Sequence, residues 1–177
     1  MARNIPEKGS TNTICKKSES KFMRGVIRHL GTEWILLRVE ALQGMMAEVN
    51  KAFGTGARVV WYLAGKGAGK SMADLIRKRV KSDNIEEIGK KVAKIYERCG
   101  WGRVQLVMLR QKTGEFLIRV HNNAFARGTR SQTTSCYYLK GLLEGIAEQL
   151  TGKHAKTEET KCMSRGDPYC EFVLVLD

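Results

Sequence analysis

Hydrophobic and polar residues recur along this chain with two different periods, and the changes of period predict its elements. Apolar residues at helical spacing predict four helices, over 40–53, 64–81, 85–99 and 134–150. Short apolar runs predict strands, at 24–39 (as a hairpin around Leu30-Gly31), 59–63, 101–109, 115–120, 154–162 and 170–176. Because turn residues separate several neighbouring strands, we expect a twisted antiparallel sheet of hairpins with helices packed on it, an α+β fold.

The boundaries of these elements carry their own signals. Gly54 and Gly56 end the first helix, and Asp83 followed by Glu86 is a capping box for the third. Residues 1–21 are polar and are expected to form a mobile tail. A chain of 177 residues fits one domain, so we assign 22–177 to a single domain that ends in a metal site.

Charge narrows the range of partners. The chain has 31 Lys and Arg against 18 Asp and Glu, a net charge of +13. This excess permits an anionic partner such as nucleic acid, an acidic protein or a phosphorylated ligand. The densest basic run, 76–81, is interpreted as the solvated end of a helix rather than a nucleic-acid patch, since no aromatic residues interleave with it.

The compartment follows from what the sequence lacks. No apolar run reaches the length of a membrane span, and the first twenty residues have no apolar centre of a signal peptide. We therefore expect a cytoplasmic protein whose five cysteines are thiols.

The stretch Ala64–Ser71 ends in Gly-Lys-Ser and looks like a phosphate-binding loop. Ala64 stands where the stricter motif has glycine, and no later strand ends in an Asp placed to hold magnesium. We therefore favour a tight strand-to-helix turn with a basic helix start. A weak anion site at that helix N-terminus stays open as a second interpretation.

Three cysteines are predicted to converge near the C-terminus. Cys162 and Cys170 flank a turn, and Cys136 lies near the start of the last long helix. A tetrahedral zinc site needs a fourth ligand, for which the candidates are Glu159, His154, His121 and Asp167. Glu159 is the best placed, although residues three apart on a regular strand face opposite sides unless a bulge intervenes. Lys153, Lys161 and Arg165 would offset the negative charge. The competing interpretations are small buried cysteines or a disulfide between Cys162 and Cys170.

The segments 136–148 and 159–172, with Cys136, Glu159-Thr-Lys-Cys162 and Cys170, resemble the 4-vinyl-reductase-like domain. The likeness is looser from Arg24 onward and does not cover the tail. It implies a fold related to TRAPP subunits and haem-based nitric-oxide sensors. It also implies a structural Zn²⁺ held by Cys136, Glu159, Cys162 and Cys170, and an internal pocket for a hydrophobic molecule. Aromatic candidates for the pocket, or equally for the core, are Trp61, Tyr62, Phe116, Phe125, Tyr137 and Tyr138. For His121 we favour a core or solvated position over haem ligation.

Three functions are compatible with these features. The first is a zinc-stabilised sensor or carrier domain for a hydrophobic or aromatic ligand, homodimeric, with a regulatory protein partner. The second is an accessory protein or reductase acting on a vinyl tetrapyrrole in (bacterio)chlorophyll-type biosynthesis. The third is a basic nucleic-acid-associated regulator, which rests on the charge alone. We favour the first and a non-enzymatic role, because no Gly-x-Gly-x-x-Gly dinucleotide motif is present.

Overall fold

The computed structural model describes residues 21–23, 25–80, 82, 84–110 and 112–177. Contacts divide the chain into two units, Met1–Arg38 and Val39–Asp177, which are described separately. The tail predicted over 1–21 lies outside the described residues except for its last position. The assignment of 22–177 to one domain stays a prediction, and the contacts themselves place a boundary after Arg38.

The first unit contains a small antiparallel sheet with strands β1 (Lys21–Met23), β2 (Val26–His29) and β3 (Thr32–Trp34). The hairpin predicted around Leu30-Gly31 is present. Both turn residues have positive φ, 49° and 63°, which suits the twist of a two-residue turn. The indole N–H of Trp34 closes the hairpin by donating to the His29 carbonyl at 2.7 Å.

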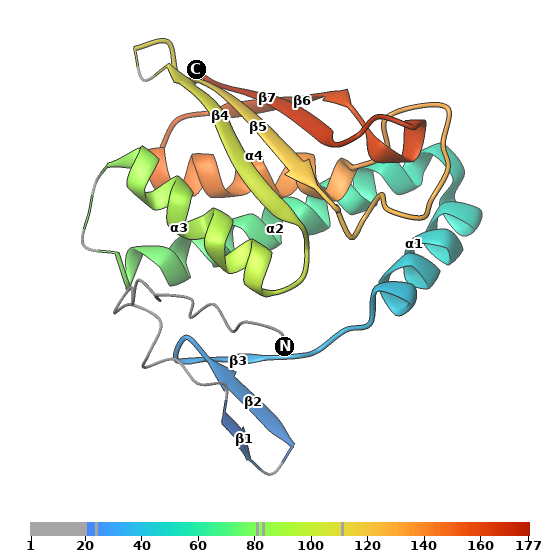
Figure 1. The fold of residues 1–177 in the computed structure, drawn as a ribbon, viewed down its shortest axis with the longest axis horizontal. Helices are drawn as coiled ribbons and strands as arrows, with labels where there is room; N and C mark the ends of the chain where they lie inside the picture. The colour runs from blue at the N-terminus through green and yellow to red at the C-terminus, as the bar shows by residue number, and fades with distance from the viewer. Residues whose placement is uncertain (1–20, 24, 81, 83, 111) are drawn as a thin grey trace, which may run out of the picture. The chain divides into compact units, whose positions relative to one another are not determined.

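The second unit is built on a four-stranded antiparallel sheet with the order β4-β5-β7-β6. Its strands are β4 (Arg103–Arg110), β5 (Glu115–His121), β6 (Ala155–Lys161) and β7 (Cys170–Leu176). Its helices are α1 (Val39–Phe53), α2 (Ala57–Arg77), α3 (Ile85–Arg98) and α4 (Tyr137–Thr151), with short 3-10 turns η1 (Gly54–Gly56) and η2 (Met163–Arg165). Figure 1 shows α3 and α4 beneath the sheet and α2 alongside α4. The α+β prediction and both C-terminal hairpins are confirmed.

Helix α2 overturns one part of the sequence interpretation. It runs without a break from Ala57 to Arg77, so the strand predicted at 59–63 and the turn predicted at 64–71 are both wrong. A five-residue apolar run does not distinguish a strand from a buried stretch of helix. The backbone N–H groups of 64–71 are engaged inside the helix, so neither a phosphate loop nor a helix N-terminal anion site exists there. The basic run does fall at the end of this helix, as expected.

The glycines of the false phosphate loop let α2 approach α4 closely. Gly65 and Gly69 face Gly141 and Gly145, and a Cβ atom on any of the four would overlap the backbone of the other helix. Gly67, on the opposite side of α2, has open space around it. We call the four facing glycines the glycine seam. It places the two helix backbones in direct contact.

Polar contacts flank the glycine seam. The Tyr62 hydroxyl hydrogen-bonds the buried carboxylate of Glu144, which also accepts the Thr157 backbone N–H at 2.7 Å. Lys66 pairs with Glu148 at 2.9 Å. These contacts tie α2, α4 and β6 together.

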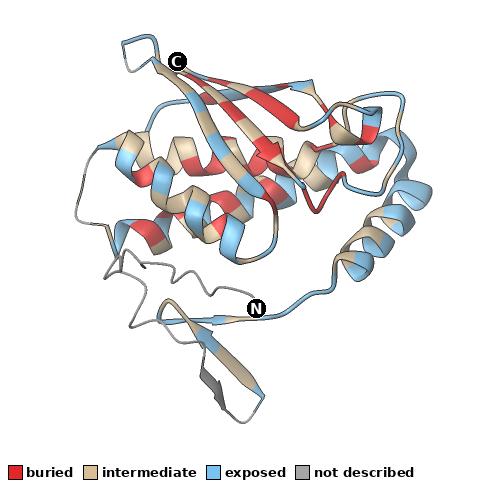
Figure 2. Cartoon of the chain, in the orientation of Figure 1, coloured by how far each residue is buried: buried red, intermediate tan, exposed pale blue. Residues whose placement is uncertain are grey.

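The core lies between the sheet and α4. Figure 2 shows the buried residues concentrated on β5, β7 and α4. Of the helix face predicted to point inward, Leu142 and Ile146 are buried, and Tyr138, Leu143 and Leu150 are partly buried.

Helix α3 starts one residue later than the predicted cap. Asn84 caps it by accepting the N–H groups of Glu86 and Glu87, while Asp83 lies outside the described residues. Within the described part of the chain, no helix combines the length and the apolar character needed to cross a bilayer.

Candidate functional site: a buried Cys3Glu cluster beside an apolar cavity

Cys136, Glu159, Cys162 and Cys170 converge at one end of the second unit, and all four are buried. Cys136 precedes α4, Glu159 is on β6, Cys162 follows β6 and Cys170 begins β7. One ligand atom from each lies within 4.8 Å of every other. The antiparallel pairing of β6 with β7 and the packing of α4 on the sheet bring the four residues together. We call them the Cys3Glu cluster.

The spacing of the sulfurs matches a tetrahedral metal site. Cys136 Sγ lies 3.8 Å from Cys162 Sγ and 3.7 Å from Cys170 Sγ. Four ligands around zinc with Zn–S bonds of about 2.3 Å place the sulfurs roughly 3.8 Å apart. All three cysteines are free, so the disulfide considered between Cys162 and Cys170 is not present.

Glu159 also has an oxygen free for a cation. Its Oε2 accepts the Cys136 backbone N–H at 3.0 Å, whereas its Oε1 is buried with no hydrogen-bond partner. A buried carboxylate oxygen without a partner costs free energy that a bound cation would recover. The donor set of three thiolates and one carboxylate therefore fits a divalent metal such as zinc.

A bulge solves the problem of strand alternation. Ala155, Thr157 and Glu159 alternate inward along β6 while Lys156 and Glu158 point outward. The pairing with β7 then shifts between Glu159 and Lys161. The extra residue returns Cys162 to the inner side, so both Glu159 and Cys162 face the cluster.

Hydrogen-bond donors surround the sulfurs. Fully buried Asn123 donates through Nδ2 to Cys136 Sγ at 3.2 Å and to Cys170 Sγ at 3.3 Å. The Met163 N–H donates to Cys170 Sγ at 3.4 Å, and the Ser164 hydroxyl lies 3.0 Å from Cys162 Sγ. Such contacts stabilise thiolates. Sequence reasoning missed Asn123, because an asparagine after a strand usually indicates only a turn.

The predicted cations do not neutralise the sulfurs directly. Arg165 pairs with Asp167 at 3.0 Å, and Lys161 lies 4.0 Å from Glu171. Asp167 itself accepts the Cys162 backbone N–H at 2.8 Å, so it supports the turn. Backbone and amide N–H groups thus supply the contacts to sulfur.

The two histidines considered as the fourth ligand lie elsewhere. His154 is beside Asp177, 3.6 Å away, and the His121 ring packs on Tyr169 at 5.3 Å. Neither histidine belongs to the cluster that the described residues form, so Glu159 is the only one of the four candidates that joins the three sulfurs there.

Without metal, the four groups share their protons unevenly. Burial raises the pKa of Glu159 to about 8, and hydrogen bonds from the Cys136 and Cys170 thiols lower the pKa of Cys162 below its usual value. The same hydrogen bond to Cys162 raises the pKa of Cys136. A divalent cation would displace these protons and bind all four groups in their anionic form.

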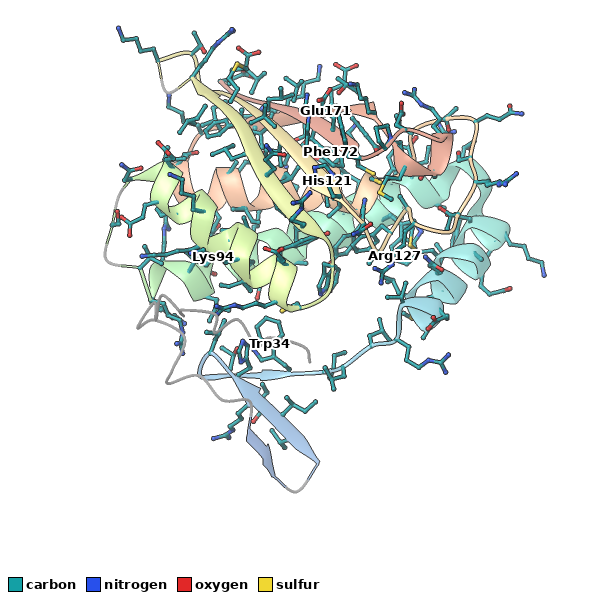
Figure 3. The ribbon with its side chains drawn as sticks, in the orientation of Figure 1. Trp34, Lys94, His121, Arg127, Glu171 and Phe172 are labelled. Atoms are coloured by element: carbon teal, nitrogen blue, oxygen red, sulfur yellow. The ribbon has the colours of Figure 1, made fainter. Side chains whose placement is uncertain are left out.

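An apolar cavity of about 460 Å³ lies between α3, the sheet and α4. Its wall includes side chains from every one of these elements, among them Ile88, Leu106, Phe116, Leu142, Ile146 and Leu174. Most of the buried side chains that line it are aliphatic. Phe172, which is fully buried on β7, lies on the strand between this cavity and the cluster residue Cys170 (Figure 3).

The six predicted pocket aromatics divide among several places. Phe116 lines the apolar cavity. Trp61, Phe125 and Tyr137 line a second, more polar cavity of about 310 Å³ between α1, α2 and the segment before α4. Tyr62 contacts Glu144, and Tyr138 stacks on Phe125 with ring centroids 4.6 Å apart. The residues of the larger cavity were missed because they are ordinary aliphatic core residues by sequence.

Comparison with known proteins locates the resemblance. Residues 116–176 match the family model of the 4-vinyl-reductase domain, a region that contains every member of the Cys3Glu cluster except Cys136's preceding loop partners. An uncharacterized protein of Methanocaldococcus jannaschii, MJ0150, is 26% identical over 125 residues, which are 70% of this chain and 68% of that protein. The resemblance to proteins with the 4-vinyl-reductase-like domain is thereby confirmed.

Solved structures confirm the fold. The phenol-responsive sensory domain of the transcription activator PoxR, solved with phenol, has a TM-score of 0.74 at 20% identity and covers 89% of this chain and 84% of its own. A TRAPP subunit 3 from Naegleria fowleri, covalently bound to palmitic acid, has a TM-score of 0.63 at 15% identity, with coverages of 78% and 92%. An H-NOX protein from S. oneidensis in the Fe(II)NO state has a TM-score of 0.54 at 16% identity, with coverages of 80% and 77%. This chain therefore has the fold shared by these sensor and TRAPP proteins.

Proposed function

We propose that this protein is a small-molecule-binding domain of the sensor or carrier type. In this proposal, an apolar molecule occupies the cavity between α3, the sheet and α4. A zinc ion held by the Cys3Glu cluster fixes α4 and the C-terminal hairpin beside it. A regulatory role, a homodimer and a protein partner stay predictions from the resemblance.

The cavity is the observation that carries the proposal. Its volume of about 460 Å³ falls within the roughly 300–1,000 Å³ of small-molecule sites, and its wall is almost wholly aliphatic. Filling it with an apolar molecule would recover contacts that the empty wall lacks. The PoxR domain was solved with phenol and the TRAPP subunit with palmitic acid, so relatives in fold hold apolar molecules.

The metal in this proposal is structural. Four protein ligands complete a tetrahedron and leave no open position for a reacting water. When bound, the ion would supply cross-linking and charge neutralisation. Cys136 also sits at the N-terminus of α4, where the helix dipole favours a thiolate. Asn123 and the backbone N–H of Met163 would hold the sulfurs in place.

The first experiment tests the metal. We expect about one zinc per chain by elemental analysis of protein purified with a reducing agent. A Cys162→Ser variant should lose most of it, whereas Cys99→Ser, which changes a cysteine outside the cluster, should keep it. Equal zinc in both variants would place the metal elsewhere.

The second experiment tests the cavity. N-phenylnaphthylamine, an uncharged fluorescent probe, should bind the zinc-loaded chain with a stoichiometry of one. Ala147→Phe fills the cavity and should abolish binding, while Lys156→Phe, on the exposed side of β6, should not. Unchanged binding by Ala147→Phe, in a variant with normal zinc content, would refute the proposed ligand site.

A further inference from the structure

One polar atom in the wall of the apolar cavity has no partner. Tyr96, near the end of α3, lines the cavity and is 7% exposed. Its hydroxyl is buried and makes no hydrogen bond within the described residues. Leaving such a group unpaired costs about 1–3 kcal/mol, and native proteins rarely retain that cost without a reason.

The other polar residues of the wall are at its edge. Lys90, Lys94 and Glu97 line the cavity but lie toward the outer side of α3, where Lys94 is seen in Figure 3. Thr151, at the end of α4, is partly exposed. Among the described lining residues, Tyr96 is therefore the buried one that offers a hydrogen bond to an occupant.

We propose that the Tyr96 hydroxyl selects the occupant of this cavity, by donating a hydrogen bond to an uncharged carbonyl oxygen on an otherwise apolar molecule. The ligand class is thus a hydrophobic ketone, aldehyde or ester. This inference rests on the proposed function and deepens it.

Two arguments favour a carbonyl over other polar groups. A carbonyl accepts the Tyr96 hydrogen and brings no hydrogen of its own, so nothing is left unpaired against the aliphatic wall. A ligand hydroxyl would bring a second hydrogen, and only one of the two could be paired between the two oxygens.

The second argument concerns charge. The cluster sulfurs of Cys136 and Cys170 act electrostatically on the Tyr96 hydroxyl, and as thiolates they would repel an anionic ligand group. Burial, with these sulfurs, raises the pKa of Tyr96 well above its ordinary value, so the hydroxyl stays protonated and able to donate.

The test compares two probes of the same shape. Naphthyl methyl ketone and isopropenylnaphthalene differ only in C=O against C=CH2, and each is titrated into the zinc-loaded full chain by calorimetry. We expect the ketone to bind roughly 5- to 150-fold more tightly, the factor that pairing one buried hydroxyl supplies. Naphthoate, which replaces the acetyl group by a carboxylate, should bind more weakly than the ketone.

Tyr96→Phe removes only the hydroxyl and should abolish the preference for the ketone without weakening the hydrocarbon. Tyr137→Phe, which alters the second cavity, is the matched control and should keep the preference. Zinc content and the thermal melt report whether each variant is folded, and the wild-type ratio tests the inference even without variants.

The outcomes separate the two proposals. Equal binding of ketone and hydrocarbon by the wild type, a preference that survives in Tyr96→Phe, or tightest binding of naphthoate would overturn the inference and leave the apolar site standing. Binding of none of the probes up to their solubility limits would overturn both.

Discussion

Replacing Gly69 by alanine should destabilise the second unit strongly, because the added methyl group has no room in the glycine seam. A Cβ atom there would lie 2.9 Å from the Ile146 nitrogen and 3.1 Å from the Gly145 Cα, and closer still to the Leu142 carbonyl oxygen. Favourable carbon contacts need about 3.5–4.0 Å, so the two helices must separate by roughly 1 Å. A gap of that size forfeits about a quarter to a half of each contact across the interface.

The expected cost is about 3 kcal/mol, at the upper end for overpacked cores because the obstacle is backbone. Alanine's better helix propensity returns at most about 1 kcal/mol of that. The net loss of about 2–3 kcal/mol corresponds to a fall in Tm of roughly 4–12 °C at this chain length.

Gly67→Ala, on the open side of the same helix, is the control and should raise Tm slightly. Thermal unfolding by circular dichroism at equal zinc content measures both variants. If Gly69→Ala melts no lower than Gly67→Ala, the close approach of α2 and α4 is not what stabilises this fold.

Three further predictions concern the cluster and its surroundings. Asn123→Ala should weaken zinc binding about 10- to 100-fold in a chelator competition, because two sulfurs lose their N–H donor; unchanged affinity would refute that role. The hydrogen bond between Lys66 and Glu148 raises the pKa of the lysine and, against the opposing effect of burial, lowers that of the glutamate. Its coupling energy, about 1 kcal/mol in a double-mutant cycle at pH 7, should therefore be lost as the pH falls through the lowered carboxylate pKa. A coupling that persists at pH 2 would contradict this. Cys99 is half-buried and burial raises its pKa, so Ellman's reagent should modify it slowly at pH 7.5, whereas the cluster thiols should react only after a chelator is added.

The sequence predicted the strands and the converging ligands well because both depend on local pattern. The turn at Gly166-Asp167 fixes the hairpin that carries Cys162 and Cys170, and alternation along β6 shows where a bulge is needed for Glu159 to face inward. The resemblance, rather than spacing alone, selected the glutamate as the fourth ligand.

The errors arose where a partner decides the structure. Gly65 and Gly69 suggest a loop by themselves, because glycine weakens isolated helices. Gly141 and Gly145 repeat the same spacing of four, and that match was the available signal for two helices in close contact. The apolar cavity gave no such signal, since Leu142 and Ile146 are indistinguishable by sequence from residues in a filled core.

Helix α4 carries Cys136 at its beginning and Leu139, Leu142 and Ile146 of the cavity wall along its length. Metal and ligand therefore act on one rigid rod from two sides. If occupancy of either place changes the affinity of the other, thermodynamics requires the effect to be equal in both directions. A cell that starves this protein of zinc would then also retune how much of its small molecule it takes up.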